Sequence, residues 1–192
     1  MVNRRWLIIA AFLLGAGLWA WRWFSGWRLE HSQDDHILAA GRRYAVDPSL
    51  VKAVVWQESR FDPRARGKAG ELGLMQLMDA ASQEWAETVR AYPLPPRHLL
   101  DPGTNTLAGT WYLRKLLLRY RQTDNPVPYA LADYNAGRAN VLKWNQGAAA
   151  TNSARFVNQI EFPGTLAYVL AVMERRERYR PDFPPAPRSG RR

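Results

Sequence analysis

The residue with the clearest potential for acid–base chemistry is Glu58, in the run Trp56-Gln57-Glu58-Ser59 at the end of an apolar helical stretch. The partial negative charge at the C-terminal end of a helix disfavours a further negative charge there, and apolar neighbours disfavour ionisation of a carboxyl group. Both effects raise the pKa of Glu58, as a general acid that works near neutral pH requires. Taken alone, however, a single Glu at a helix end is more often a solvated carboxylate.

Few other chemistries have the residues that they need. The chain has no Cys, which excludes disulfides, thiolate metal sites and cysteine nucleophiles. Its three His residues, His31, His36 and His98, do not stand at metal-ligand spacing to another strong ligand. Gly-rich phosphate-binding motifs and the G-x-S-x-G nucleophile motif do not occur. We therefore predict a site without a metal ion or cofactor.

Helices are the elements expected to position Glu58, because from Asp34 onward apolar residues recur at helical spacing and no alternating run suggests a strand. Asp47-Pro48 supplies an N-cap and a first-turn proline, and the helix that starts there ends at about Ser59, which places Glu58 in its last turn. Further helices are predicted from Asp101-Pro102 to about Tyr120, from Pro126 or Pro128 to Asn135 with Gly137 as the stop, over 138–144, and from Pro163 to Tyr179. The sequence thus predicts an all-α domain over residues 32–178.

The N-terminal region indicates membrane targeting. Residues 6–21 form an uncharged run of sixteen, WLIIAAFLLGAGLWAW, preceded by Arg4 and Arg5, and a spanning helix needs about 20 apolar residues. The tryptophan-rich stretch Trp19–Trp27 is typical of an interfacial aromatic belt, which favours a retained transmembrane helix over a cleaved secretory signal. We predict that residues 1–28 form a cytoplasmic tail and a single-pass membrane anchor, with the next domain assumed to lie on the other side of the membrane.

Basic charge gathers at the two ends of the chain, whose formal net charge is +10. Residues 1–28 contain four Arg and no acid, and residues 174–192 contain seven Arg against three acids. A nucleic-acid-binding protein is expected to carry such charge on its folded domain, so nucleic acid is not a predicted partner. Anionic lipid or an anionic wall polymer fits basic ends better. Residues 180–192, rich in Pro and Arg, are predicted to form a disordered tail.

Three motifs together resemble a known enzyme family. In chain order they are Glu58-Ser59-Arg60-Phe61, Gly73-Leu74-Met75-Gln76-Leu77 and Ala132-Asp133-Tyr134-Asn135-Ala136-Gly137. This set is similar to that of the soluble-type (SLT domain) lytic transglycosylases, relatives of goose-type lysozyme. The similarity covers about residues 37–144, with a weaker continuation to Tyr168-Val169. It implies a lysozyme-like helical fold and a catalytic role for Glu58.

The reaction that the resemblance implies is cleavage of the β-1,4 bond between N-acetylmuramic acid and N-acetylglucosamine in peptidoglycan, without water. Glu58 would give a proton to the glycosidic oxygen and then take one from the muramic acid 6-hydroxyl, which closes on C1 to leave a 1,6-anhydro end. An intramolecular hydroxyl has a large effective concentration. Ordinary glycosidases need a second carboxylate, which the family pattern does not require.

The resemblance also implies roles for five supporting residues. Gln76 is expected to hydrogen-bond the sugar or the loop after Glu58, and Met75 to pack beneath the sugar or in the core. Tyr134 is similar to a family tyrosine whose hydroxyl points toward the catalytic glutamate. Asn135 would orient the substrate or cap its own helix, and Ser59 would support the site or form a local cap.

Some positions depart from the family pattern. Gly67 stands where many members have Ser, Glu71 replaces a small residue, and Gly164 stands where a Glu is frequent. The loop after Glu58 is therefore expected to be looser, and contacts with peptide stems are in doubt. One of the acids near the motifs could also activate water; these acids are Asp62, Glu71, Asp79 and Asp133. A hydrolytic muramidase and a non-catalytic wall-binding assembly protein thus remain alternatives.

Overall fold

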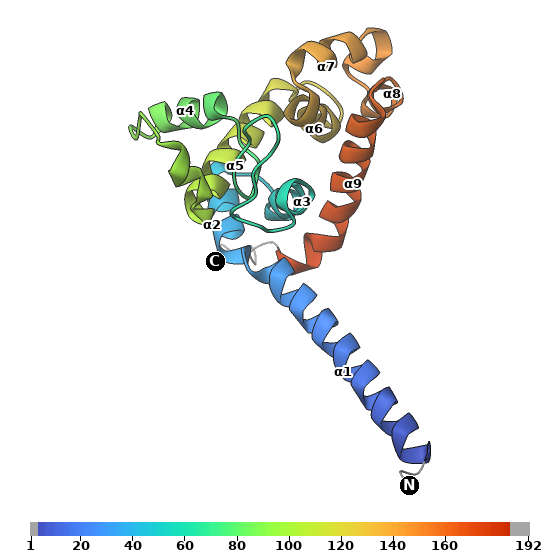
Figure 1. The fold of residues 1–192 in the computed structure, drawn as a ribbon. Coiled ribbons are helices and arrows are strands. Elements are labelled where there is room, and N and C mark those ends of the chain that lie inside the picture. The colour runs from blue at the N-terminus through green and yellow to red at the C-terminus, as the bar shows by residue number, and fades with distance from the viewer. Residues whose placement is uncertain (1–3, 185–192) are drawn as a thin grey trace, which may run out of the picture. The chain divides into compact units, whose positions relative to one another are not determined.

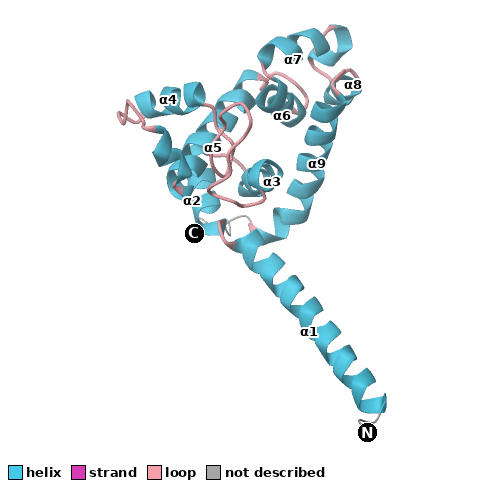
Figure 2. Ribbon diagram, in the orientation of Figure 1, coloured by secondary structure: helices cyan, strands magenta, loops and turns pink. Residues whose placement is uncertain are grey.

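The computed structural model describes residues 4–184, with side chains described from residue 13 onward. It divides into two compact units, residues 1–33 and 34–192, each described here by itself. The described part of the first unit contains one helix, and the second contains helices joined by loops (Figures 1 and 2). Two isolated β-bridges are formed, Arg66 with Leu72 and Leu72 with Leu77. Apart from these bridges, the described residues contain no β-strand. The predicted all-α fold class is confirmed.

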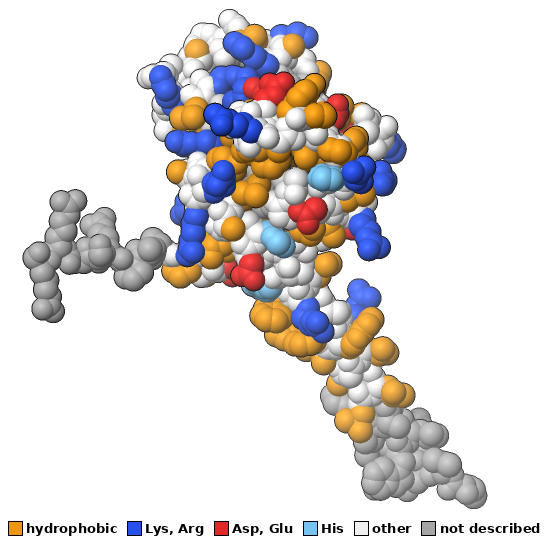
Figure 3. Space-filling view, turned by 90° about the vertical axis from the view of Figure 1, so that its left-hand side faces the viewer, with side chains coloured by type: hydrophobic (Ala, Val, Ile, Leu, Met, Phe, Trp, Pro, Cys, Tyr) orange, Lys and Arg blue, Asp and Glu red, His pale blue; other side chains and the backbone are white. Residues whose placement is uncertain are grey.

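The first unit is the helix α1, Arg4–His31. Large apolar side chains along it are at least about half exposed to solvent, and Figure 3 shows several of them on the face in view; they are Leu13, Leu14, Leu18, Trp19, Trp21, Trp23, Phe24, Trp27 and Leu29. Within the described part of the chain, no helix has the length and apolarity needed to cross a membrane. The helix is therefore confirmed here, and the predicted transmembrane span is not.

The second unit contains the remaining helices. Its α-helices are α2 Asp34–Tyr44, α3 Pro48–Ser59, α4 Asp79–Thr88, α5 Pro102–Arg119, α6 Pro126–Ala136, α7 Arg138–Trp144, α8 Ser153–Asn158 and α9 Pro163–Tyr179. Short 3-10 helices are η1 Pro96–Leu100, η2 Gly147–Ala150 and η3 Arg180–Asp182. The predicted helix ends agree closely with α3, α5, α6, α7 and α9.

Local capping explains where three of these helices begin. The side chain of Asp47 accepts a hydrogen bond from the Ser49 amide at the start of α3, and Asp101 accepts one from the Thr104 amide at the start of α5. Asn125 caps α6 in the same way. In each helix a proline occupies the first turn, where its missing N–H costs nothing. These signals are local, and the sequence therefore locates them well.

Helix α3 packs against α2 and α9 and forms part of the core (Figure 1). Val51, Val54 and Val55 of α3 are fully buried, and each such side chain contributes on the order of 1.5–3 kcal/mol when it leaves water. Lys52 of the same helix is also fully buried, so α3 is enclosed on more than its apolar face. The helix that carries Glu58 is thus held on several sides by the rest of the domain.

Burial of Lys52 is made possible by two carboxylates. Its ammonium group forms ion pairs with Asp34 and Asp182, each at 2.8 Å, and lies over the rings of Tyr179 and Phe183. Asp182 belongs to η3, so the prediction of disorder from residue 180 is wrong for the first residues of the tail. Residues 185–192 of that predicted tail lie outside the described residues.

Two α-helices, α4 and α8, were not predicted, and each buries few of its residues. In α4 the buried residues are Ser82, Trp85 and Ala86, so the helix lacks a continuous apolar stripe. In α8, which has six residues, Phe156 is the buried one. Their helical state depends on packing against the rest of the domain more than on sequence pattern.

We expect Lys52→Ala to lower the free energy of unfolding by about 2–5 kcal/mol, because it empties the space of a fully buried side chain and removes the ion-pair partner of two carboxylates that are about one-quarter exposed. The matched control is Lys115→Ala, whose ion pair with Glu84 is roughly one-third to one-half exposed and should contribute about 1 kcal/mol or less. Chemical denaturation of the full chain measures both. Equal, small losses in the two variants would contradict this account of the core.

Candidate active site

Glu58 lies in the last turn of α3, as predicted, and is partly buried. The helix ends because Arg60 adopts a left-handed conformation, φ 54°. The backbone amide of Arg60 donates a hydrogen bond to the Trp56 carbonyl. Phe61 follows at φ 65°. Two successive non-glycine residues in this region are costly, and they turn the chain sharply directly after the candidate acid.

The carboxyl group of Glu58 is held by one hydroxyl group. Tyr168 of α9 donates a hydrogen bond to Oε1 of Glu58 at 2.6 Å, although the two residues are 110 positions apart. Tyr168 is 5% exposed, and its burial raises the pKa of its hydroxyl well above the ordinary value, with the nearby Glu58 charge adding to the effect. The hydroxyl therefore stays protonated and remains a donor over the whole working pH range.

Burial raises the pKa of Glu58 from 4.5 to about 7. The hydrogen bond from Tyr168 opposes this change because it favours the ionised form, and the negative charge of Glu71 reinforces it. The direction agrees with the prediction from sequence, although burial and not the helix end is the main cause. Near pH 7 the carboxyl group is close to half protonated, so it can both give and take a proton.

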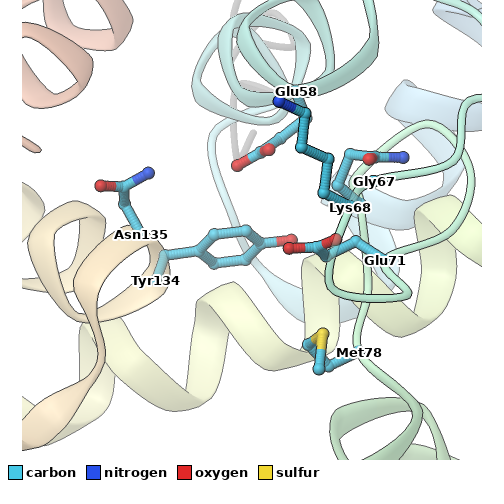
Figure 4. Close-up of a pocket in the computed structure, with 8 residues that line it drawn as sticks. Glu58, Gly67, Lys68, Glu71, Met78, Tyr134 and Asn135 are labelled. Atoms are coloured by element: carbon cyan, nitrogen blue, oxygen red, sulfur yellow. The ribbon is translucent and has the colours of Figure 1, made fainter. Parts of the chain in front are cut away.

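Glu58 opens onto a pocket of about 260 Å³ (Figure 4). Helix α6 contributes Tyr134 and Asn135 to its wall. The loop between α3 and α4 contributes the rest of the lining, namely Gly67, Lys68, Glu71, Gln76 and Met78. The three sequence motifs therefore meet at one place, although α3 and α6 lie far apart in the chain.

Asn105 of α5 fixes the loop between α3 and α4. Its amide nitrogen donates to the carbonyls of Leu72 and Leu99, and its oxygen accepts from the Met75 amide, all at 2.8 Å. Gly73 lies against this amide at φ 76°, where a Cβ would be 2.3 Å from Nδ2 of Asn105. A side chain at 73 is therefore excluded both by conformation and by space. Asn105 is a positioning residue to which the sequence analysis assigned no role, although it lies within the stretch that resembles the family.

Of the two roles considered for Met75, beneath the sugar or in the core, the structure supports the core. Met75 is fully buried, and a Cβ on Gly109 of α5 would be 2.4 Å from its sulfur atom, so Met75 belongs to the core. Met78, which is 48% exposed, provides the apolar wall of the pocket instead. The sequence analysis did not single out Met78; its exposure and its place in the pocket wall identify it.

Gln76 lines the pocket, and its side-chain amide donates to the Gly73 carbonyl at 2.9 Å. This contact matches the expected bond to the loop after Glu58. Gln76 itself adopts a left-handed conformation, φ 46°. Like Arg60 and Phe61, it holds a costly conformation beside the pocket, a feature that concentrates at functional sites.

Tyr134 reaches the pocket, as predicted, but its hydroxyl does not hydrogen-bond Glu58. It donates to the Met75 carbonyl at 2.7 Å, so Tyr134 supports the loop, while Tyr168 contacts Glu58. Burial raises the pKa of the Tyr134 hydroxyl well above its ordinary value, and the nearby Glu58 charge adds to this effect. The one sequence signal for Tyr168 was its place in the weak continuation of the motif match.

The two remaining predicted residues differ in position. Ser59 is nearly buried, and its hydroxyl donates to the Val55 carbonyl of its own helix at 3.1 Å, so it has the local structural role. Asn135 lines the pocket, and its side-chain oxygen accepts from the hydroxyl of Thr165 at 2.8 Å. Asn135 thereby links the end of α6 to the first turn of α9, the helix that carries Tyr168.

Of the four acids near the motifs, Glu71 is the one that lines the pocket with Glu58. Asp133 is 2% exposed and bonds Arg119 and the Tyr120 hydroxyl. Asp62 accepts from the Arg64 amide, and Asp79 begins α4. A water-activating second carboxylate would therefore have to be Glu71.

The Transglycosylase SLT domain family matches residues 35–157. The chain belongs to this family. The soluble lytic murein transglycosylase of Escherichia coli K12 is 34% identical over 133 residues, 67% of this chain and 20% of the relative. The membrane-bound lytic murein transglycosylase F of Desulfosudis oleivorans is 34% identical over 146 residues, 74% of this chain and 29% of the relative.

Solved structures show the same lysozyme-like SLT fold. The 70 kDa soluble lytic transglycosylase of Escherichia coli aligns with a TM-score of 0.66 at 29% identity, covering 75% of this chain and 24% of that one. A complex of the 70 kDa soluble lytic transglycosylase with bulgecin A aligns with a TM-score of 0.72 at 27% identity, covering 82% and 25%. This SLT-domain chain thus spans about a fifth to a third of the length of the relatives named here.

Ionisation of Glu58 should reduce stability, because its pKa of about 7 in the folded chain exceeds the ordinary value of 4.5 that applies in the unfolded chain. The stability linked to the neutral carboxyl is present below about pH 4.5 and is lost as pH rises through 7. We therefore expect Glu58→Gln to stabilise the full chain more at pH 8 than at pH 5, by about 2 kcal/mol. Denaturation at the two pH values measures this, with the exposed Glu87→Gln as control. An equal effect at both pH values would mean that Glu58 is not protonated in the folded chain near neutrality.

Proposed function

We propose that this SLT-domain chain is a peptidoglycan lytic transglycosylase that cleaves the bond between N-acetylmuramic acid and N-acetylglucosamine without water, leaving 1,6-anhydromuramic acid ends. The observation that carries the proposal is Glu58, a partly buried carboxyl with a pKa of about 7 that opens onto the pocket where the family motifs meet. The family membership supports the same reaction class.

In the proposed first step, protonated Glu58 donates its proton to the glycosidic oxygen as the bond from that oxygen to C1 breaks. The positive charge develops at C1 and the ring oxygen. Glu58 becomes a carboxylate, and the hydrogen bond from Tyr168 stabilises that form.

In the second step, the 6-hydroxyl of the same muramic acid attacks C1 and forms the new bond. Its proton goes to the Glu58 carboxylate, which restores the starting state of the enzyme. Because the nucleophile is part of the substrate, the step gains the advantage of an intramolecular reaction. Tyr134, Gln76 and Asn135 would contact the sugar from the walls of the pocket.

A hydrolytic muramidase is the second candidate, and the presence of Glu71 in the pocket favours it. A hydrolase needs a second carboxylate to activate water or to act as nucleophile. A wall-binding protein without turnover is the third candidate, and it would bind glycan strands independently of the protonation of Glu58.

Product analysis separates the three candidates. We expect the full chain to release 1,6-anhydromuropeptides from isolated cell walls, and Glu58→Gln to lose this release by at least about 100-fold, the lower end for a general acid, while it stays folded. Mass spectrometry of the digest is the measurement, and Glu87→Gln is the control. Reducing ends that carry a solvent oxygen would establish the hydrolase instead, and unchanged biological activity of Glu58→Gln would establish the binding protein.

We further propose that residues 1–28 attach the domain to the bacterial inner membrane, with the catalytic domain in the periplasm. The support is the uncharged run of residues 6–21 after Arg4 and Arg5, together with the exposed apolar side chains of α1. Such a surface is stabilised by transfer into lipid.

Fractionation of cells tests the attachment. We expect the full chain to sediment with membranes and to resist extraction by high salt, and a variant with Trp19, Trp21 and Trp23 changed to Ser to shift to the soluble fraction. Protease added to intact spheroplasts should digest the catalytic domain. Recovery of the unchanged chain in the soluble fraction would contradict the proposal.

A further inference from the structure

Glu71 is held on the pocket wall by its own loop. The backbone pairs across the loop through the amide of Gly67, which donates to the Glu71 carbonyl at 2.8 Å, and through the bridge between Arg66 and Leu72. One carboxylate oxygen of Glu71 accepts from the Ala69 amide at 3.0 Å. The carboxylate is therefore fixed in position by backbone contacts.

Gly67 leaves the space that this carboxylate occupies. Its φ is not in the left-handed region, so its backbone conformation does not require glycine. A Cβ at this position would instead be 2.0 Å from Oε2 of Glu71 and 2.7 Å from Cδ. Any side chain at 67 would push the Glu71 carboxylate aside. The two departures from the family pattern, Gly67 and Glu71, thus form one structural unit.

Glu71 shares the pocket with Glu58, and its negative charge disfavours a second negative charge there. The other charged or titratable groups near Glu58 are Lys68 of the same loop, Tyr134 of α6 and Tyr168 of α9. Lys68 and the Tyr168 hydrogen bond favour the carboxylate form of Glu58. Glu71 is therefore the group whose charge opposes them.

We propose that Glu71 is a positioning residue of the reaction, acting on Glu58 as a like charge across the pocket, and that the missing side chain at Gly67 gives it room. The inference rests on the proposed function, because the role assigned to Glu71 is to keep Glu58, the proton donor, protonated at neutral pH. It adds to the family pattern a second functional carboxylate that takes no part in bond making or breaking.

The pH dependence of cell-wall cleavage by the full chain tests the proposal. Activity should fall as pH rises through the pKa of Glu58, because the proton donor is lost. In Glu71→Gln this fall should move to lower pH, so that activity at pH 8 relative to pH 5 drops about threefold or more. Glu71→Asp, which keeps the charge, should restore much of the wild-type profile, and the exposed Glu87→Gln should not alter it.

Gly67→Ser provides a second, steric test of the same unit. It should displace the Glu71 carboxylate and shift the profile in the same direction as Glu71→Gln. Gly67→Ser combined with Glu71→Gln should shift it no further, because the two changes remove one interaction. Independent, additive shifts would contradict the coupling between the two positions.

A readout that does not use activity separates this inference from the proposed function. Glu58→Gln should raise the melting temperature at pH 8 more than at pH 5, and that difference should shrink in the Glu71→Gln background. An unchanged difference, with an unchanged pH profile, would overturn the role of Glu71. Wild-type products with reducing ends that disappear in Glu71→Gln would also overturn it, because Glu71 would then be the base that activates water.

Discussion

Withdrawal of one carboxyl group from water is the constraint on which this site depends. Burial brings the pKa of Glu58 to about 7, which makes both of its protonation states accessible near neutrality. Above pH 7, burial of this carboxyl group costs on the order of 3 kcal/mol of folding free energy relative to the carboxylate in water. The rest of the structure must offset that cost. The buried faces of α3 and the ion pairs of Lys52 do so on the same helix that carries Glu58.

The site is completed by elements that approach α3 from distant parts of the chain. Helix α9 brings Tyr168 to Glu58, and α5 holds the loop between α3 and α4 through Asn105. That loop carries Gln76 in a left-handed conformation, while Tyr134 ties it to α6. The costly backbone conformations therefore occur where several hydrogen bonds determine the path of the chain, which is how such strain is retained.

Features that depend on neighbouring residues can be predicted from the sequence. Contacts between residues far apart in the chain cannot, because they depend on how the helices pack. Asp47-Pro48 locates α3 and the position of Glu58 in it, since a cap and a proline act within one turn. The choice between Tyr134 and Tyr168 as partner of Glu58 depends on how α6 and α9 pack, which periodicity does not encode. The packing of the Glu71 carboxylate into the space that Gly67 leaves is likewise a contact that the sequence analysis did not predict.

Direct titration of the Glu58 carboxyl group tests the central claim. Carbon-13 NMR of the full chain labelled at the glutamate carboxyl carbons reports each carboxyl group as pH changes, and the Glu58 resonance is identified by its loss in Glu58→Gln. A midpoint near 7 is the predicted result, in line with the effect of burial. A midpoint near the ordinary value of 4.5 would show that Glu58 is ionised at neutral pH and does not serve as the proton donor.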